Sequence, residues 1–370
     1  MDLTFLPIDI ILHIEKFVYF TPKDNRDLKQ IIRLYRSKKI TNYKINSLTT
    51  QFITKKFGNI STWNTRHITN MDYLFENCHF FNEDISNWDV SNVKSMNFMF
   101  HNAMSFNQPI GKWNTKNLQK INNIFYHATD FNQPLNWDTN NLIEMMNAFK
   151  FAKNFNQNIN NWNVSKIELF CGVFYSAINF NKSLYNWNVS NATNMSYMFY
   201  DAFAFNKYIQ NWDISNVVDL TSMFEGTKNF NQPLNNWKLD NVVRMEKMFK
   251  SSIYNRPLNK WKFKKVRSLK ALFCNAEKFN QDLNSWDVSE INNMNSLFCH
   301  ATSFNGDITD WDTGQVIDIE YMFYYADNFD KKLHNWDIDN VKNMDYLFSN
   351  NQINNYKNIS KLLHYFFYIH

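Results

Sequence analysis

Apolar side chains recur along this chain with a period of 25 residues. Neighbouring Trp residues are 25 positions apart, or 24 in two places, and a Phe follows every Trp twelve positions later. The Trp stand at positions 63, 88, 113, 137, 162, 187, 212, 237, 261, 286, 311 and 336. A unit of this length is too short to enclose its own apolar side chains, so we expect the units to stack and share one core.

The spacing of the apolar positions changes within one unit. Ile85 and Val90 flank Trp88, and this spacing of apolar residues approximates the period of two that predicts a short strand. From Val93 to Ala103 the apolar positions are three or four apart, which predicts a short helix or helical turn. The sequence therefore predicts an α/β fold, a leucine-rich-repeat-like solenoid of about twelve 25-residue coils with a parallel sheet.

Asparagine follows the first aromatic residue of nearly every unit, as at Asn82 and Asn107, and the chain holds 60 Asn in all. An Asn side chain offers two donors and an acceptor, so a ladder of Asn could bind the backbone groups of each turn in coil after coil. We expect this ladder to be structural, because turning chain without partners for its amide groups would be costly.

Composition excludes a disordered chain, because 44% of the 370 residues are apolar and 18% are aromatic. No run of 18 apolar residues occurs, so we expect no membrane span. The four Cys form no CxxC pair and the first residues do not read as a signal peptide, which favours a cytoplasmic protein. Net charge is +5, and residues 1–56 hold 11 Lys/Arg against 5 Asp/Glu, which sets them apart from the repeats.

Two amphipathic helices are predicted in that first region, over residues 6–18 and Asn25–Arg36. We divide the chain into a helical module (1–50), the repeats (57–351) and a C-terminal cap (352–370). A stack of repeats needs its open ends covered, so a plain N-terminal cap is one interpretation of the helical module.

The repeat unit that begins at Phe81, FNEDISNWDVSNVKSMNFMFHNAMS, resembles the BspA-like leucine-rich repeats, with the signature FNxxLxxWDVSNVxxMxxMFxxA. The FNQPI and FNQPL segments at Phe106, Phe131 and Phe230 are also similar to the FNIP repeats of amoebae and their giant viruses. The resemblance covers residues 57–351. It implies a solenoid that binds other macromolecules and is not a catalyst.

The segment LPIDIILHIEKFV at residues 6–18 resembles the start of an F-box. That resemblance implies docking onto a Skp-type adaptor, in the host cytoplasm if the protein is viral. It also implies that the repeats select substrates for a cullin–RING ubiquitin ligase. The implied adaptor-binding residues are Leu6, Pro7, Ile10, Ile11, Ile14 and Phe17.

Polar residues directly after each Trp predict a partner-binding sheet face, with Asn163, Asn188, Asp213, Lys238, Lys262, Asp287, Asp312 and Asp337 as candidates. Residues 238–270 hold 11 Lys/Arg against 2 acids, and the candidate basic patch is Arg256, Lys260, Lys264, Lys265 and Arg267. Such a patch favours an acidic protein partner, and we do not expect nucleic acid. A surface that is only solvated is the alternative for both sets.

Catalytic chemistry finds no support in the sequence, which contains no GxGxxG, GxxxxGK[ST] or HExxH motif. Cys274 and Cys299 should stack, and we interpret them as buried thiols without a metal. We therefore expect no enzyme, no cofactor and no metal. The predicted function is a protein–protein interaction scaffold, with substrate recognition for a ubiquitin ligase as its specific form. A structural or surface-adhesion protein is the alternative.

Overall fold

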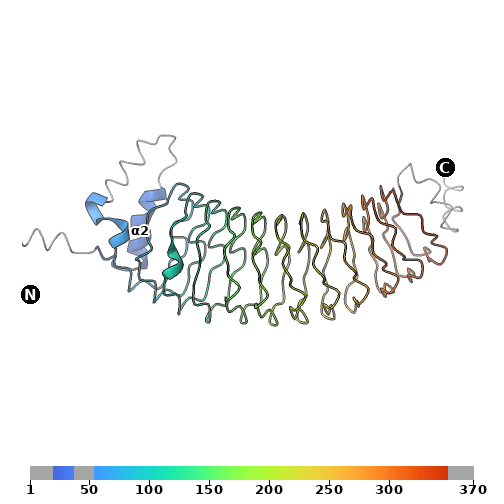
Figure 1. Ribbon diagram of the computed structural model, residues 1–370, viewed down its shortest axis with the longest axis horizontal. Coiled ribbons are helices and arrows are strands. Elements are labelled where there is room, and N and C mark those ends of the chain that lie inside the picture. The colour runs from blue at the N-terminus through green and yellow to red at the C-terminus, as the bar shows by residue number, and fades with distance from the viewer. Residues whose placement is uncertain (1–19, 37–53, 349–370) are drawn as a thin grey trace, which may run out of the picture.

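The computed structural model describes residues 20–36 and 54–348. Each repeat unit closes one coil, and the coils stack in sequence order into an elongated, gently curved body (Figure 1). We number the coils 1 to 12 by their Trp, from Trp63 to Trp336, and count positions from that Trp, so that the Phe stands at position +12.

The described helices are short and lie at the N-terminal end. They are α2 (Asn25–Arg36), residues 54–57, and two 3-10 turns, η2 (Ile60–Thr62) and η3 (Ile110–Lys112), of which η3 lies in coil 3. α2 confirms the second predicted helix. Its Leu28, Ile31 and Ile32 are buried in the same core cluster as the coils, so its apolar face packs onto the end of the stack.

α2 also supplies a backbone partner that coil 1 needs. In coil 2 the Lys94 N–H donates to the Thr69 carbonyl of the preceding coil at 2.9 Å. In coil 1 the Oδ1 of Asn25 takes the place of that carbonyl and accepts from the Thr69 N–H at 3.1 Å. α2 therefore acts as a cap. The other predicted helix (6–18), with all six adaptor-binding residues, and the predicted cap over 352–370 lie outside the described residues.

Most neighbouring coils are joined by isolated parallel β-bridges and not by extended strands. All but one of the bridges pair position +7 of successive coils, as in Asn70 with Ser95 and Ser95 with Lys120, and the exception pairs Phe323 with Phe348. Over residues 20–36 and 54–348 no strand is longer than one bridge. The predicted parallel sheet is wrong, and with it the predicted α/β fold class.

Two sharp turns replace the short helix that the sequence predicts in this part of the coil. Positions +10 and +14 have left-handed backbone, as at Tyr73 (φ 60°) and Asn77 (φ 59°). Their N–H groups donate to the next coil, Tyr73 to the Asn97 carbonyl (2.8 Å) and Asn77 to the His101 carbonyl (2.7 Å). An α-helix would need these N–H groups for its own carbonyls. The spacing of three and four thus reflects two turns that point apolar side chains inward, and not a helix.

The indole rings form the predicted continuous column. Every one of the twelve is at most 5% exposed. In each coil from the second on, the indole N–H donates to a carbonyl of the preceding coil, as from Trp88 to Ile60 at 2.8 Å. Each ring from Trp88 on therefore contributes buried apolar area and a hydrogen bond that satisfies its buried N–H.

The predicted Asn ladder is confirmed as well. The Asn107 N–H donates to the Oδ1 of Asn82 at 2.9 Å, and the Asn132 N–H donates to the Oδ1 of Asn107 at 3.0 Å. The same bond recurs in successive coils as far as Asp330, whose N–H donates to Asn305. The high Asn content is thus explained by turns that bind one another along the stack.

Candidate functional site

The surface at positions +9 to +14 of the coils, which we call the corner face, carries side chains beside the two left-handed turns. Its backbone repeats from coil to coil, whereas its side chains vary. Position +10 holds Tyr73, Asn123, Gly172 and Lys247 in four coils, all at φ between 55° and 61°. Because such different residues support the same turn, an aromatic side chain at this position is not required by the fold.

Aromatic rings nevertheless form a continuous line on the corner face of coils 1 to 6. The first pair, Tyr73 and Phe98, stacks with ring centroids 4.8 Å apart, and ring contacts continue from coil to coil. Tyr73 is 45% exposed and Tyr197 is 38% exposed, so the line is open to solvent. We call it the aromatic stripe. Its members are Tyr73, Phe98, His101, Tyr126, Phe151, Tyr175, Tyr197 and Tyr200.

A lysine lies within the aromatic stripe. The Nζ of Lys150 is 4.0 Å from the ring centroid of Tyr175 and also lies over Tyr126 and Phe151. Burial lowers the pKa of Lys150. Burial, followed by the neighbouring Tyr200, raises the pKa of Tyr175 to about 12. The centre of the stripe is thus partly desolvated, which strengthens any polar contact made there.

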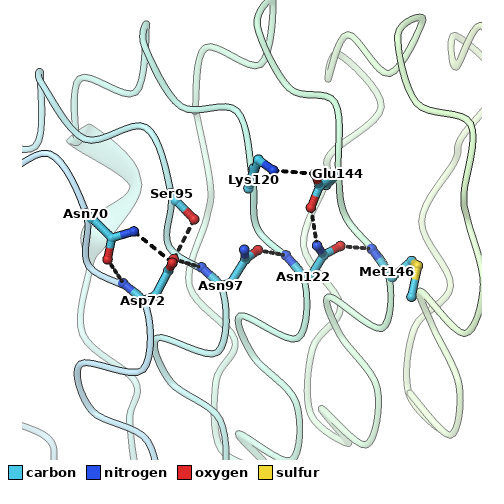
Figure 2. A network of polar contacts seen from close by, with 8 residues as sticks. All are labelled: Asn70, Asp72, Ser95, Asn97, Lys120, Asn122, Glu144 and Met146. Carbon is cyan, nitrogen blue, oxygen red and sulfur yellow. Dashed lines mark hydrogen bonds and ion pairs between the residues drawn. The ribbon is translucent and has the colours of Figure 1, made fainter.

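Polar side chains at position +9 hold the first coils in register beside the stripe (Figure 2). The Oδ1 of Asp72 accepts from the Asn97 N–H at 2.8 Å, and the Oδ1 of Asn97 accepts from the Asn122 N–H at 2.7 Å. The Oδ1 of Asn122 then accepts from the Met146 N–H at 2.8 Å. Each of these side chains joins two coils, so the rings beside them are presented on a fixed support.

The residues of the predicted partner-binding sheet face directly follow each Trp, where the described chain forms no sheet, and most of their side chains stabilise turns. All eight candidates are exposed. The Oδ1 of Asn163 accepts from the Ser165 N–H, and the Oδ1 of Asp287 accepts from the Ser289 N–H, both at 3.1 Å. The same bond is made by Asn188, Asp213, Asp312 and Asp337, whereas Lys238 and Lys262 carry no acceptor. Asx turns of this kind are a structural use of the column.

Hydrogen bonding lowers the pKa of two carboxyl groups of this column. Bonds from the Ser289 side chain and backbone lower the pKa of Asp287, and bonds from Ser215 lower that of Asp213 in the same way. The carboxylates are therefore already bound within their own coils.

The residues of the predicted basic patch are exposed but do not share one face. They range from five positions before Trp261 to six after it, and so follow the circumference of coil 9. Lys264 pairs with Asp240 at 2.9 Å and Arg267 with Glu290 at 3.2 Å. Arg256 donates to a backbone carbonyl, while Lys260 and Lys265 reach Asn side chains of the preceding coil. Much of this charge is engaged within the chain.

The two thiols stack as the 25-residue spacing predicts. Cys274 and Cys299 are each 8% exposed and pack together with Ala271. The neighbouring Cys274 thiol and burial raise the pKa of Cys299. In the described ranges 20–36 and 54–348, no group of three or more His, Cys, Asp or Glu side chains is arranged to hold a metal.

The aromatic stripe was missed by the sequence analysis, which examined the strand beside the Trp. The available signal was the occurrence of aromatic residues at positions +10, +13 and +14 in coils 1 to 6, which coils 7 to 9 replace by Ser, Glu, Gly, Lys, Ala, Cys and Asn, and which returns as Tyr321, Tyr324, Tyr325 and Tyr346 in coils 11 and 12. These positions were interpreted as part of a helix, which hid the fact that they share an exposed corner.

In the part of the chain that the structure describes, no helix combines the length and apolar character needed to cross a membrane.

Comparison with known proteins identifies a family and nothing more specific. The family described as "Mycoplasma protein of unknown function, DUF285" matches residues 44–160, 143–255, 186–286 and 250–362. No curated protein and no solved structure matches the chain. The overlapping matches follow the repeats along their whole length.

Proposed function

The chain belongs to the DUF285 family of repeat proteins, and we propose that it recognises a protein partner through the aromatic stripe of coils 1 to 6. The observation that carries the proposal is the stripe itself. Its partly exposed rings occupy positions where other coils build the same turns with Asn, Gly, Ser or Lys. Aromatic side chains that the fold does not require are typical of a binding surface.

The chemistry of the stripe suits a protein partner. Tyrosine combines a large rigid apolar ring with a hydroxyl group, so it adds contact area at little cost in conformational entropy and still forms hydrogen bonds. Five of the eight rings are Tyr, and position +9 fixes the register of coils 1 to 4 beside the first part of the stripe. A preorganised surface of this kind loses little freedom on binding.

The test replaces two rings in the centre of the stripe. A Tyr175→Ser/Tyr200→Ser variant removes a stacked pair with centroids 4.4 Å apart. Tyr185→Ser/Tyr208→Ser is the matched control, because these exposed Tyr also contact each other, at 6.2 Å, but lie outside the corner face. Proteins captured by the wild type and the control, and lost with the stripe variant, are the expected result. Identical capture by all three would contradict the proposal.

A narrower function, substrate recognition for a ubiquitin ligase, would rest on the F-box resemblance of residues 6–18. The test is binding of a Skp-type adaptor to the full chain and to an Ile10→Asp/Ile14→Asp variant. Binding that is lost in the variant would support this function, whereas no binding of the wild type, beside a control F-box that binds, would remove it. The alternative, a structural or adhesion protein, requires the partner to be an assembly in which this chain is a component.

A further inference from the structure

The corner face of coils 8 to 12 lacks the stripe and carries opposite charges at its two ends. Lys247 in coil 8 and Lys270 in coil 9 are exposed at positions +10 and +9. Glu320 in coil 11 and Asp345 in coil 12 stand at position +9. The wider composition follows the same division, since residues 238–270 hold 11 bases against 2 acids and residues 300–348 hold 10 acids against 3 bases.

These four charges remain available to a partner. In the described ranges 20–36 and 54–348, no ion pair joins Lys247, Lys270, Glu320 or Asp345 to another residue. Glu320 accepts a hydrogen bond from the Asn295 side chain at 3.0 Å, which fixes its direction without neutralising its charge. Lys250, which lies on this half of the face in coil 8, is already paired with Glu225 of coil 7.

A neutral apolar floor lies between the two charged ends. Ala271, Cys274 and Cys299 pack together, and Tyr321 and Tyr324 pack against them. Beyond them Tyr346 is 61% exposed and stacks on Tyr321 with centroids 5.0 Å apart. An apolar centre with charges at its rim has the composition of a protein–protein interface.

The spacing of the charges makes this surface self-complementary. Coils 9 and 11 lie one step on either side of coil 10, and coils 8 and 12 lie two steps away. A two-fold axis through coil 10, perpendicular to the stack, therefore places Lys270 opposite Glu320 of a second copy and Lys247 opposite Tyr346 of that copy, whereas Glu246, at position +9 of coil 8, comes opposite Asp345. The pair of Lys270 with Glu320 therefore carries the complementarity. An isologous contact of this kind forms each pair twice.

We propose that the corner face of coils 8 to 12 binds a second copy of this chain, antiparallel and side by side, with Lys270 of each copy paired to Glu320 of the other. The neutral apolar floor, with the Cys274 and Cys299 thiols of coils 9 and 10, lies at the centre of the contact. This inference goes beyond the proposed function, because it concerns coils that lack the stripe, and dimerisation would present two stripes on one assembly.

The experiment is sedimentation velocity of the full chain with two charge-reversal variants, Lys270→Glu and Glu320→Lys. The wild type is expected to dimerise at low salt, with a dissociation constant that rises with ionic strength. Each single variant places like charges opposite each other, so its self-association should weaken by about tenfold or more. An equimolar mixture of the two variants should form a heterodimer, because both cross-pairs are then Glu opposite Lys.

The mixture also controls for folding, since two misfolded chains would not restore association. Lys262→Glu, an exposed reversal in coil 9 outside the corner face, is the matched control and should dimerise like the wild type. A wild type that stays monomeric at low salt at about 100 μM, a value chosen to detect weak surface pairing, would overturn the proposal. So would a mixture that fails to associate, or a dimer that both reversals leave intact.

Discussion

The N–H at position +9 finds its acceptor in one way in coils 2 to 4 and in another way in coils 6, 7 and 9 to 11. The N–H at position +9 points away from the core in both regions and needs an acceptor. In the first region the acceptor belongs to the preceding coil, as when Asn97 accepts from the Asn122 N–H at 2.7 Å. In the second it belongs to the same coil, as when Asp219 accepts from the Thr221 N–H at 2.9 Å.

The choice of acceptor decides what the side chain at position +9 can do. In the first region this side chain accepts a hydrogen bond from the backbone of the next coil, so contacts with a partner are left to the aromatic rings beside it. In the second region position +7 supplies the acceptor, as Asp318 does for Glu320 at 3.0 Å, and position +9 carries a charge in coils 9 and 11, at Lys270 and Glu320. One repeat can thus present rings on one half of the corner face and charge on the other.

The largest loss of stability should be the same in both regions, because the indole column runs through both. Trp162→Ala and Trp286→Ala each remove a ring that is at most 4% exposed, together with its hydrogen bond to the preceding coil. Each should lower the free energy of unfolding by about 3–5 kcal/mol in urea titrations. A loss confined to one of the two variants would show that the column is not continuous.

Position +9 should separate the two regions. Asn122→Ala removes the acceptor of the Met146 N–H and leaves that group without a partner, at a cost of about 1–3 kcal/mol. Thr221→Ala stands at the same position in coil 7, where Asp219 caps the backbone, and should change stability by less than about 0.5 kcal/mol. Urea titration of both variants measures the difference. Equal losses would contradict the division into two regions.

At position +7 we expect the opposite order, with the larger loss of stability in the second region, and a smaller loss than at position +9. Asn194→Ala in coil 6 removes the acceptor of the Ser196 N–H, which should cost about 1 kcal/mol and speed hydrogen exchange at that amide. Lys120→Ala in coil 3 removes only a surface ion pair with Glu144, for which less than about 1 kcal/mol is expected. Unchanged exchange at Ser196 would show that another group accepts from that N–H.

The smallest effect concerns pH and is expected from Tyr175 in the stripe. The pKa of Tyr175 is raised to about 12, whereas a Tyr in an unfolded chain titrates near 10. The unfolded chain therefore loses this proton first, so the stabilisation is complete below about pH 10 and is lost as the pH rises towards 12. Tyr175→Phe should flatten that decline in urea titrations at pH 9 to 11. Tyr185→Phe, at a position 53% exposed, is the control and should follow the wild type.

The sequence predicted the stack, the buried indole column and the Asn ladder, because each follows from one residue type repeated at one spacing. It did not predict the backbone between Val93 and Ala103. Apolar residues three or four apart fit a helix and a pair of turns equally well, and the choice depends on bonds to the next coil. The aromatic stripe was missed for the same reason, since its residues share a face only when the chain turns at positions +10 and +14.

The most direct test of the account measures distances along the stack, on which both proposed surfaces depend. Spin labels are placed on cysteines introduced at the exposed position before the Trp, pairing Lys112 in turn with Asn161, Asn211, Lys260 and Asp310. These pairs lie two, four, six and eight coils apart. Pulsed electron–electron double resonance should give distances that grow by about 10 Å for every two coils, because paired backbones lie about 4.8 Å apart. Distances that do not grow with the number of coils would contradict a single continuous stack.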